Sequence, residues 1–314
     1  MEESVQRYIT HLQAEKNASP HTVDNYRRDI LEFRDFLTGQ KVTSWDTVDR
    51  LALRKWLGWL QARGIVRASI ARKMTEVRSF YRFMVRERIL ETNPLLAMSS
   101  PKVPRRLPNF LTQEQVLVLL DAPDASSPQG QRDRAILEML YASGMRLSEI
   151  AGLDLPDIAL HRREIRVWGK GSKERVVLIG QPAAGALQHY LSDGRPRLIG
   201  KRATDAVFVN KFGDRLSMRS IDALLSKYTK MVGLDGGITP HVLRHTFATH
   251  LLEGGADLRV VQELLGHAGL QTTQVYTHVT QSQARKVYMD SHPRAKPRDQ
   301  DNTRRSECPQ ESLP

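Results

Sequence analysis

The chain has 314 residues, a formal net charge of +12 and a pI near 9.9. This length allows two domains with separate cores, and the excess of positive charge favours a nucleic-acid partner. No apolar run approaches the roughly 18 to 20 residues of a membrane span, and the N-terminus lacks the features of a secretory signal. The single cysteine, Cys308, cannot form an internal disulfide, which favours a reducing, cytoplasmic compartment.

Residues 1–92 are predicted to form an N-terminal domain made only of helices. Apolar residues recur at helical spacing near the start of the chain, and Ser19 followed by Pro20 is typical of a helix N-terminus. Two further helices are predicted, one from about Thr47 to Ala62 and one from Ala68 to about Arg88.

The last of these helices is strongly basic. From Arg63 to Arg88 the chain carries eight basic and two acidic residues. A solvated helix face is the ordinary interpretation of such a run, but this excess has one sign and lacks compensating acids. Together with the candidate active site below, it favours contact with DNA phosphates through Arg72, Lys73 and Arg82.

The pattern changes after the helical domain. Residues 93–109 contain four prolines and no sustained periodicity, and they are interpreted as an interdomain linker. A second domain is predicted over residues 110–290. Residues 291–314 are polar and of mixed charge, which is typical of a disordered tail.

The second domain is predicted to be mainly helical with a small β-hairpin. Thr112 begins a T-x-x-Q capping box, and helical patterns resume from about Ala184. The hairpin strands are predicted at Glu164 to Trp168 and at Arg175 to Ile179, joined by the turn-prone segment GKGSKE. The expected fold class is therefore mainly α with a small hairpin or sheet in the second domain.

The candidate chemistry is concentrated near the C-terminal end of the second domain. His241, Arg244, His267 and Tyr276 lie within forty residues. These side chains supply two imidazoles, a guanidinium and a phenol, without a carboxylate pair or a thiol. Such a set suits displacement at an anionic phosphodiester with tyrosine as the nucleophile.

Two upstream residues extend this set. Arg146 follows a predicted helix end at Gly144, where a structural ion pair is the ordinary alternative. Lys170 lies at the tip of the hairpin, where simple exposure is the alternative; a lysine there could protonate a leaving oxygen.

Four other kinds of site are not supported. GKGS lacks the earlier glycine of a P-loop, and His241 and His245 lack the glutamate of a zinc-hydrolase motif. No acidic cluster indicates a two-metal nuclease, and Ser148 lies in no G-x-S-x-G elbow. We therefore expect neither a metal nor a cofactor.

The chain resembles the tyrosine recombinase (phage integrase) family in four segments, RLSEIAGL, GKGSKER, HVLRHTFATHLL and LLGHAGLQTTQVYTHV. Within the family it resembles the Xer branch, and the segments VVLIGQPA and ARKVYMDSHPRAK look most like the XerC group rather than the partner XerD group. The resemblance covers residues 1 to about 296 and implies a two-domain DNA clamp, in which a helical core-binding domain precedes a catalytic domain. The family pattern does not need the tail beyond Lys296.

The resemblance implies catalytic roles for the candidate residues. Tyr276 would attack the scissile phosphate and form a 3′-phosphotyrosine, releasing a 5′-hydroxyl. Arg146 and Arg244 would hold the non-bridging oxygens as negative charge develops.

His241 would act as general base or as a hydrogen-bond donor to the phosphoryl oxygens, with His267 assisting. Lys170 would protonate the leaving 5′ oxygen. Because the phosphotyrosine retains the bond energy, rejoining would need neither ATP nor metal.

The resemblance further implies a site-specific recombinase that acts on double-stranded DNA. It would form a heterotetramer containing two subunits of this chain and two of a XerD-like recombinase, bound to a dif-like site. Its reaction would convert chromosome dimers to monomers at cell division. Two alternatives remain open: a phage or integron integrase, and an architectural DNA-binding protein that does not cleave.

Overall fold

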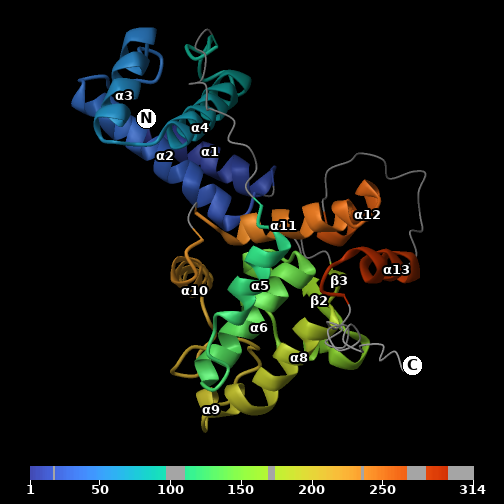
Figure 1. The fold of residues 1–314 in the computed structure, drawn as a ribbon. Coiled ribbons are helices and arrows are strands. Elements are labelled where there is room, and N and C mark those ends of the chain that lie inside the picture. The colour runs from blue at the N-terminus through green and yellow to red at the C-terminus, as the bar shows by residue number, and fades with distance from the viewer. Residues whose placement is uncertain (17, 97–109, 169–173, 235–236, 267–280, 296–314) are drawn as a thin grey trace, which may run out of the picture. The chain divides into compact units, whose positions relative to one another are not determined.

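The computed structural model describes residues 1–16, 18–96, 110–168, 174–234, 237–266 and 281–295 (Figure 1). The chain divides into two compact units, Met1–Arg106 and Leu107–Pro314, so the division falls inside the predicted 93–109 linker. Each unit has a core of its own. Among the described residues, no helix is both long and apolar enough to cross a membrane.

The first unit contains the helices α1 (Glu2–Ala14), α2 (Pro20–Gly39), α3 (Arg50–Ala62) and α4 (Arg67–Arg86). The predicted start of α2 is confirmed, because the Ser19 side chain accepts a hydrogen bond from the Thr22 backbone at 3.2 Å. Helix α3 begins later than predicted, because Asp49 caps it by accepting from the Ala52 backbone at 2.7 Å. The sequence thus predicted these helices well, with small errors at their ends.

Aromatic side chains dominate the core of the first unit. Tyr8, Trp56 and Phe80 are fully buried, and the Tyr8 hydroxyl donates to Ser79 at 2.9 Å. Leu95 is also fully buried in this core, although it lies within the predicted linker. The helical unit therefore holds a few residues beyond the predicted boundary at 92.

The second unit is mainly helical, as predicted. It begins with α5 (Gln113–Asp121), α6 (Pro128–Ser143), α7 (Leu147–Ala151) and the short turns η1 (Leu155–Asp157) and η2 (Leu160–Arg162). A three-stranded sheet is formed by β1 (Ile158–Ala159), β2 (Glu164–Trp168) and β3 (Glu174–Leu178). The remaining elements are α8 (Gln181–His189), the π-turn η3 (Tyr190–Gly194), α9 (Arg195–Ile199), α10 (Met218–Met231), α11 (Pro240–Glu253), α12 (Leu258–Leu265) and α13 (Gln281–Ser291).

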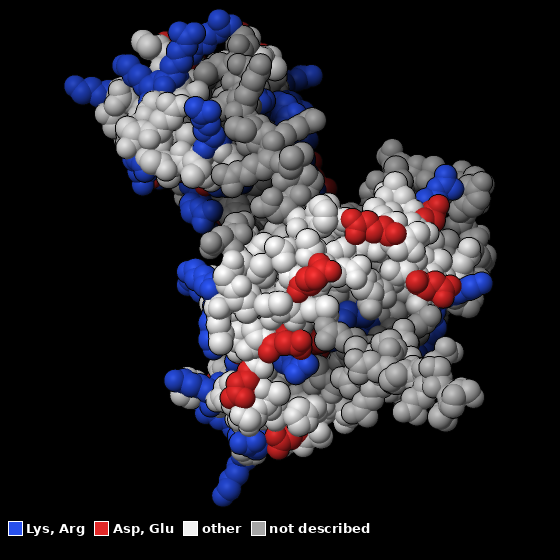
Figure 2. Space-filling model, viewed as in Figure 1, with Lys and Arg blue, Asp and Glu red and all other residues white. Residues whose placement is uncertain are grey.

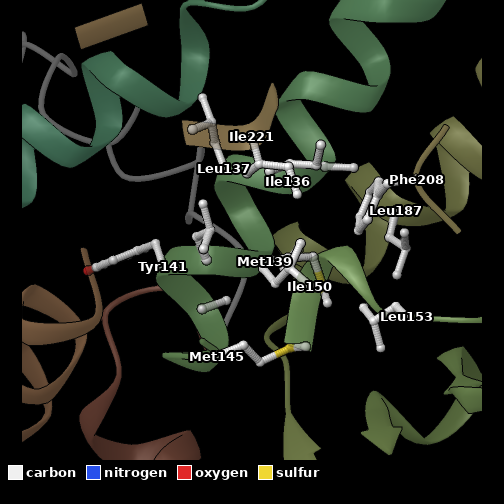
Figure 3. Packing of buried hydrophobic residues seen from close by; sticks show 14 of the residues in the cluster. Ile136, Leu137, Met139, Tyr141, Met145, Ile150, Leu153, Leu187, Phe208 and Ile221 are labelled. Atoms are coloured by element: carbon white, nitrogen blue, oxygen red, sulfur yellow. The ribbon is translucent and has the colours of Figure 1, made fainter. Parts of the chain in front are cut away.

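Helix α6 is the central element of the second unit. It is buried on nearly every face, as expected for a helix surrounded by other elements rather than one with a single apolar stripe. Figure 3 shows Ile136, Leu137 and Met139 of α6 within a cluster that also holds Leu187 of α8 and Ile221 of α10. This helix is therefore the element against which most of the second unit packs.

The sheet is antiparallel in the order β1-β2-β3. In the predicted hairpin, Glu164 pairs with Leu178 and Trp168 pairs with Glu174. The first predicted strand is confirmed, and the second begins and ends one residue earlier than predicted. The hairpin tip, residues 169–173, lies outside the described residues.

The structure differs from the predicted tail boundary at residue 291. Helix α13 packs on the rest of the second unit, where the Tyr288 hydroxyl donates to the Ala142 carbonyl at 2.9 Å. Beyond the helix, Arg294 forms a buried ion pair with Glu138, and Ala295 is fully buried. The chain therefore packs on this unit as far as Ala295, which a local pattern of polar residues could not reveal.

His292 makes the stability of the second unit depend on pH. The residue is 4% exposed, and its ring stacks on that of Tyr288 at 5.1 Å. Burial, followed by the neighbouring His250, lowers the pKa of His292 to about 3. An unfolded histidine has a pKa of roughly 6.5, so the unfolded chain binds the proton first as the pH falls. The stabilisation is therefore complete above pH ~6.5 and declines toward pH ~3 by up to ~1.4 kcal/mol per pH unit.

We expect His292→Phe to remove much of this decline. The free energy of unfolding would be compared at pH ~7.5 and ~5.5 by urea-dependent hydrogen exchange of α13 in the full chain. The variant should lose stability at the higher pH, because the ring nitrogen that accepts from the Arg294 backbone is absent. His245→Phe is the control, since this residue is only partly buried. An equal decline in wild type and His292→Phe would contradict the prediction.

Candidate active site

Arg146 is placed by a sharp change of direction after α6. The helix ends at Gly144, which adopts the left-handed conformation with φ of 57°. A Cβ at this glycine would lie 2.5 Å from the ring of Phe247, so both the backbone angle and the space require glycine. Arg146 then caps α7, and its backbone N–H donates to Glu149 at 2.7 Å. Its position is therefore defined by backbone geometry as well as by its side chain.

The Arg146 side chain is partly exposed and faces two partners. One guanidinium nitrogen, Nη1, donates to Oε1 of Glu149 at 2.9 Å. The other, Nη2, donates to the backbone carbonyl of Gly266 at 3.1 Å. With 41% of the side chain exposed, the guanidinium is accessible to a ligand. An arginine held in this way can bind a phosphate without losing its orientation.

Arg244 lies on α11 and is 8% exposed. Its guanidinium donates to two backbone carbonyls, that of Gly144 at 2.5 Å and that of Leu265 at 2.6 Å. Within the described residues, no carboxylate forms an ion pair with it. Burial, with repulsion from Arg146 second, lowers the pKa of Arg244 to about 10, so the group remains charged at neutral pH. A buried cation held by neutral carbonyls favours an anionic ligand.

His241 lies in the first turn of α11 and is exposed. The Thr239 side chain caps this helix by accepting from the Val242 backbone at 3.3 Å, and Pro240 occupies the first turn as predicted. His241 is three residues before Arg244, so the two residues share one face of the helix. The helix N-terminus adds a partial positive charge near this face.

Two contributors to the site were missed in the sequence analysis. Arg175 of β3 donates from Nη1 and Nη2 to the two carboxylate oxygens of Glu149, at 2.5 and 2.9 Å. Burial alone would raise the pKa of Glu149, but hydrogen bonds from Arg175 and from the Arg146 backbone hold that pKa below its usual value. Both residues lie inside quoted motifs, RLSEIAGL and GKGSKER, but a motif does not state which side chains pair.

The described part of the site is therefore strongly electropositive. Three guanidinium groups, those of Arg146, Arg175 and Arg244, lie near one carboxylate, that of Glu149. In the described part of the chain, no group of three His, Cys, Asp or Glu side chains lies close enough to hold a metal ion. This arrangement can bind a phosphodiester and stabilise additional negative charge on its oxygens.

Three of the six predicted catalytic residues lie outside the described residues. Lys170 belongs to the segment between β2 and β3, and His267 directly follows Gly266 in the sequence. Tyr276 lies between α12 and α13 along the chain. The structure thus brings Arg146 and Arg244 together and leaves the other assignments as predictions.

Comparison with known families identifies the chain. A model of the phage integrase family matches residues 109–283, and a model of the phage integrase N-terminal SAM-like domain matches residues 5–88. The chain belongs to the phage integrase family. Its relatives in the family include tyrosine recombinases named XerC and XerD, so this enzyme is a site-specific DNA recombinase of the Xer branch.

Two relatives illustrate this similarity. The tyrosine recombinase XerC of Pelotomaculum thermopropionicum is 46% identical over 302 residues, which cover 93% of this chain and 98% of that protein. The tyrosine recombinase XerD of Staphylococcus aureus is 42% identical over 295 residues, covering 94% and 100% of the two chains. The sequence identity of this chain to the XerC protein is thus comparable to its identity to the XerD protein.

Solved structures support the fold class. A lambda integrase dimer bound to a COC′ core site matches with a TM-score of 0.65 at 18% identity, covering 89% of this chain and 99% of that chain. The XerH recombinase bound to a palindromic difH substrate matches with a TM-score of 0.66 at 23% identity, covering 87% and 77%. These likenesses confirm the predicted fold of a helical domain followed by a recombinase catalytic domain.

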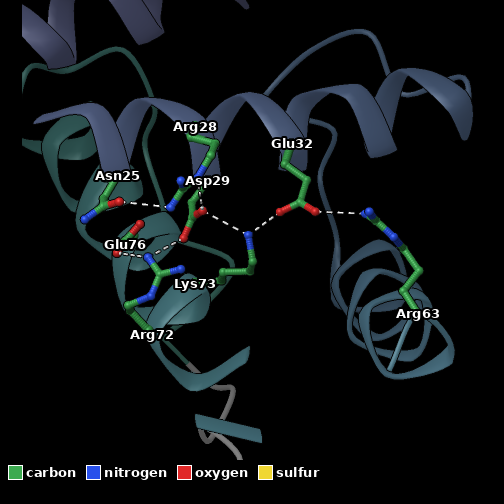
Figure 4. Close-up of polar contacts among 8 residues, drawn as sticks. All are labelled: Asn25, Arg28, Asp29, Glu32, Arg63, Arg72, Lys73 and Glu76. Carbon is green, nitrogen blue, oxygen red and sulfur yellow. Dashed lines mark hydrogen bonds and ion pairs between the residues drawn. The ribbon is translucent and has the colours of Figure 1, made fainter. Parts of the chain in front are cut away.

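The three basic residues predicted to contact DNA differ in their surroundings. Figure 4 shows Lys73 between two carboxylates of α2, with Nζ 2.9 Å from Asp29 and also in contact with Glu32. Arg72 forms ion pairs with Asp29 at 2.6 Å and with Glu76 at 2.5 Å. Lys73 is buried, whereas the Arg72 side chain is 42% exposed. The basic pattern of α4 therefore includes a lysine whose charge is used inside the recombinase's helical unit.

The pKa values of two carboxylates in this network, Glu76 and Asp29, are shifted from their usual values. Burial, followed by the hydrogen bond with Asp29, raises the pKa of Glu76 to about 7. Burial opposes ionisation of Asp29 as well, but hydrogen bonds from Lys73 and Glu76 keep the pKa of Asp29 below its usual value.

In contrast to Lys73, the Arg82 side chain on α4 is exposed. In the view of Figure 2, Lys and Arg side chains are prominent on the first unit.

This contrast predicts different effects of two alanine substitutions in one helix of the recombinase. Lys73→Ala removes one partner of the buried Asp29 carboxylate and of the partly buried Glu32 carboxylate. Because Arg72 and Arg63 still pair with these carboxylates, the free energy of unfolding of the first unit should fall by ~1–3 kcal/mol. Arg82→Ala removes an exposed charge and should change it by no more than ~0.5 kcal/mol. Urea unfolding followed by tryptophan fluorescence reports mainly on this unit, because Trp45, Trp56 and Trp59 all lie there. If Lys73→Ala lowered the free energy of unfolding as little as Arg82→Ala, the Lys73 network would contribute little to stability.

Proposed function

We propose that this recombinase cuts and rejoins double-stranded DNA through a 3′-phosphotyrosine formed by Tyr276. The observation that carries the proposal is the convergence of Arg146 and Arg244, more than ninety residues apart in sequence, on one electropositive site. A scissile phosphate bound there would be oriented by two guanidinium groups. These groups would also stabilise the extra negative charge of the pentacoordinate transition state.

The other predicted residues complete the reaction in this proposal. The Tyr276 oxygen forms the new bond to phosphorus, and its proton passes to His241 if that residue acts as the base. His267 assists by donating to the phosphoryl oxygens. The bond from phosphorus to the 5′ oxygen breaks, and Lys170 supplies the proton that this oxygen takes up.

We further propose that the enzyme is of the XerC type and acts with a XerD-like partner. Two subunits of each would assemble on a dif-like site in the cytoplasm, exchange strands through a Holliday junction and convert chromosome dimers to monomers at cell division. Similarity over almost the full length to proteins named XerC and XerD supports this proposal, as does similarity in fold to XerH bound to difH. A phage or integron integrase is the main alternative, and it would not require the XerD-like partner.

The nucleophile is tested with a nicked duplex that traps the covalent intermediate by losing a short 5′-hydroxyl fragment. Wild-type protein, with and without a XerD-like partner and in EDTA without ATP, should form an adduct that resists SDS. Tyr276→Phe should abolish the adduct and retain duplex affinity, because only the attacking oxygen is removed. Adduct formation by Tyr276→Phe would exclude this residue as the nucleophile. Tight binding by wild type with no adduct on any substrate would favour an architectural protein instead.

DNA contact by α4 is tested through the salt dependence of binding. We propose that Arg72 and Arg82, the two exposed members of the predicted set, approach DNA phosphates. Each phosphate contact contributes about 0.9 to the slope of log K against log salt. Arg82→Ala should therefore lower the slope by about one and weaken binding to all sequences alike. Lys73→Ala serves as the comparison, because its amine would have to leave Asp29 and Glu32 to reach a phosphate. An unchanged slope for Arg82→Ala would assign that residue to a solvated face.

A further inference from the structure

Arg175 lies at the loop end of the β2–β3 hairpin, one strand pair from the loop and five residues after Lys170 in the sequence. It belongs to β3 and pairs in register with Val167 of β2. The side chain is only 16% exposed, and both of its terminal nitrogens bind the Glu149 carboxylate. The resulting two-pronged ion pair connects the hairpin to the first turn of α7. Such a fork fixes direction as well as distance, which a lysine could not do.

Glu149 is shared between two arginines. Its Oε1 accepts from Arg175 and from Nη1 of Arg146, and its Oε2 accepts from Arg175 and from the Arg146 backbone. The carboxylate is 2% exposed, so water cannot readily replace any of these donors. As long as Arg175 occupies both oxygens, Glu149 cannot close a two-pronged ion pair around Arg146. The Nη2 donor of Arg146 thus remains directed to the Gly266 carbonyl and away from the carboxylate.

The Arg175 side chain also supports the backbone that precedes His267. Gly266 ends α12 in the left-handed conformation with φ of 65°. A Cβ on Gly266 would lie 2.9 Å from both Cδ and Nε of Arg175, so glycine is needed for close contact. The carbonyl of Gly266 accepts from Arg146 at 3.1 Å. Arg146, Arg175 and Gly266 therefore form one contact network that includes three active-site segments.

We propose that Arg175 is a positioning residue for DNA cleavage, acting on Arg146 through Glu149. This inference rests on the proposed function. A phosphodiester carries one negative charge, and its pentacoordinate transition state carries about two. The three described guanidinium groups and the Glu149 carboxylate leave an excess of two positive charges, which matches the transition state. Removing Arg175 halves this excess and frees Glu149 to neutralise Arg146.

The first consequence is a loss of cleavage rate rather than of DNA affinity. Single-turnover adduct formation on the nicked duplex, at saturating full-length protein, should be about 100-fold slower for Arg175→Gln, the scale of effect that misplacement of a catalytic group produces. Arg175→Lys retains the charge but loses the fork, so its rate should fall between those of wild type and Arg175→Gln. Duplex affinity, measured by fluorescence anisotropy, should remain within about threefold of wild type in both variants, because many other phosphate contacts contribute to it.

The matched control is Arg166→Gln. Arg166 lies on the neighbouring strand β2 and is also ion-paired, to Asp157 at 3.2 Å, but its side chain is 42% exposed and it does not contact Glu149. This variant removes the same charge from the same hairpin. Its cleavage rate should match that of wild type.

A second substrate distinguishes a loss of charge stabilisation from a general distortion of the active site. In this duplex a methyl group replaces one non-bridging oxygen of the scissile phosphate, so the transition state carries one negative charge fewer. On this substrate Arg175→Gln should slow cleavage by only about 10-fold or less relative to wild type, because the transition state carries less charge to stabilise. Comparing two substrates within each variant cancels any difference in the fraction of folded protein.

The outcomes are distinguishable. A wild-type rate for Arg175→Gln, or an equal loss on both substrates, would overturn the positioning role. An equal loss of cleavage rate in Arg166→Gln would overturn it as well. Removal of any positive charge from the hairpin would then have the same effect. Absence of an adduct with wild-type protein would overturn the proposed function and this inference with it.

Discussion

The buried guanidinium of Arg244 is held by two backbone carbonyls, and among the described residues no carboxylate forms an ion pair with it. Burial of an incompletely neutralised cation costs several kcal/mol, so the surrounding fold must stabilise this arrangement. The two carbonyls come from Gly144, at the end of α6, and from Leu265, at the end of α12. Helix C-termini present carbonyl groups that lack partners within the helix, and they carry partial negative charge. The ends of two helices thus hold a cation whose positive charge is not cancelled by a direct ion pair.

This arrangement depends on packing well outside the site. The end of α6 is defined by Gly144, where the ring of Phe247 from α11 leaves no room for a side chain. Helix α13 then packs against the same helix through the bond from Tyr288 to Ala142. Consequently α6, α11 and α13 are held together by buried contacts around the segments that supply Arg146 and Arg244. A rigid core of this kind allows the charged groups to be organised before a substrate binds, which reduces the cost of reorganisation during the reaction.

The two units use ion pairs in different ways. In the first unit, Lys73 and Arg72 are held by the carboxylates of Asp29, Glu32 and Glu76, so positive charge is compensated locally. In the active site, Glu149 is outnumbered by guanidinium groups, so positive charge remains. The same residue types therefore stabilise a helix interface in one place and prepare an anion site in another. The number of carboxylates within reach, rather than the number of basic residues, decides between these outcomes.

The sequence by itself determined the helical first domain and the hairpin, and it predicted the set of catalytic residue types. These features depend on local signals: the Ser19 cap, the alternation in Glu164–Trp168 and the family motifs around Arg146 and Arg244. Only the tertiary structure decided that Lys73 turns inward to Asp29, which lies 44 residues away, and that Arg175 clamps Glu149, which lies 26 residues away. It also decided that His292, Arg294 and Ala295 are buried, although the polar composition of this segment indicated a tail. The physical reason is that periodicity specifies which face of an element is apolar, whereas ion-pair partners and the docking of a polar segment are set by which elements the fold brings together.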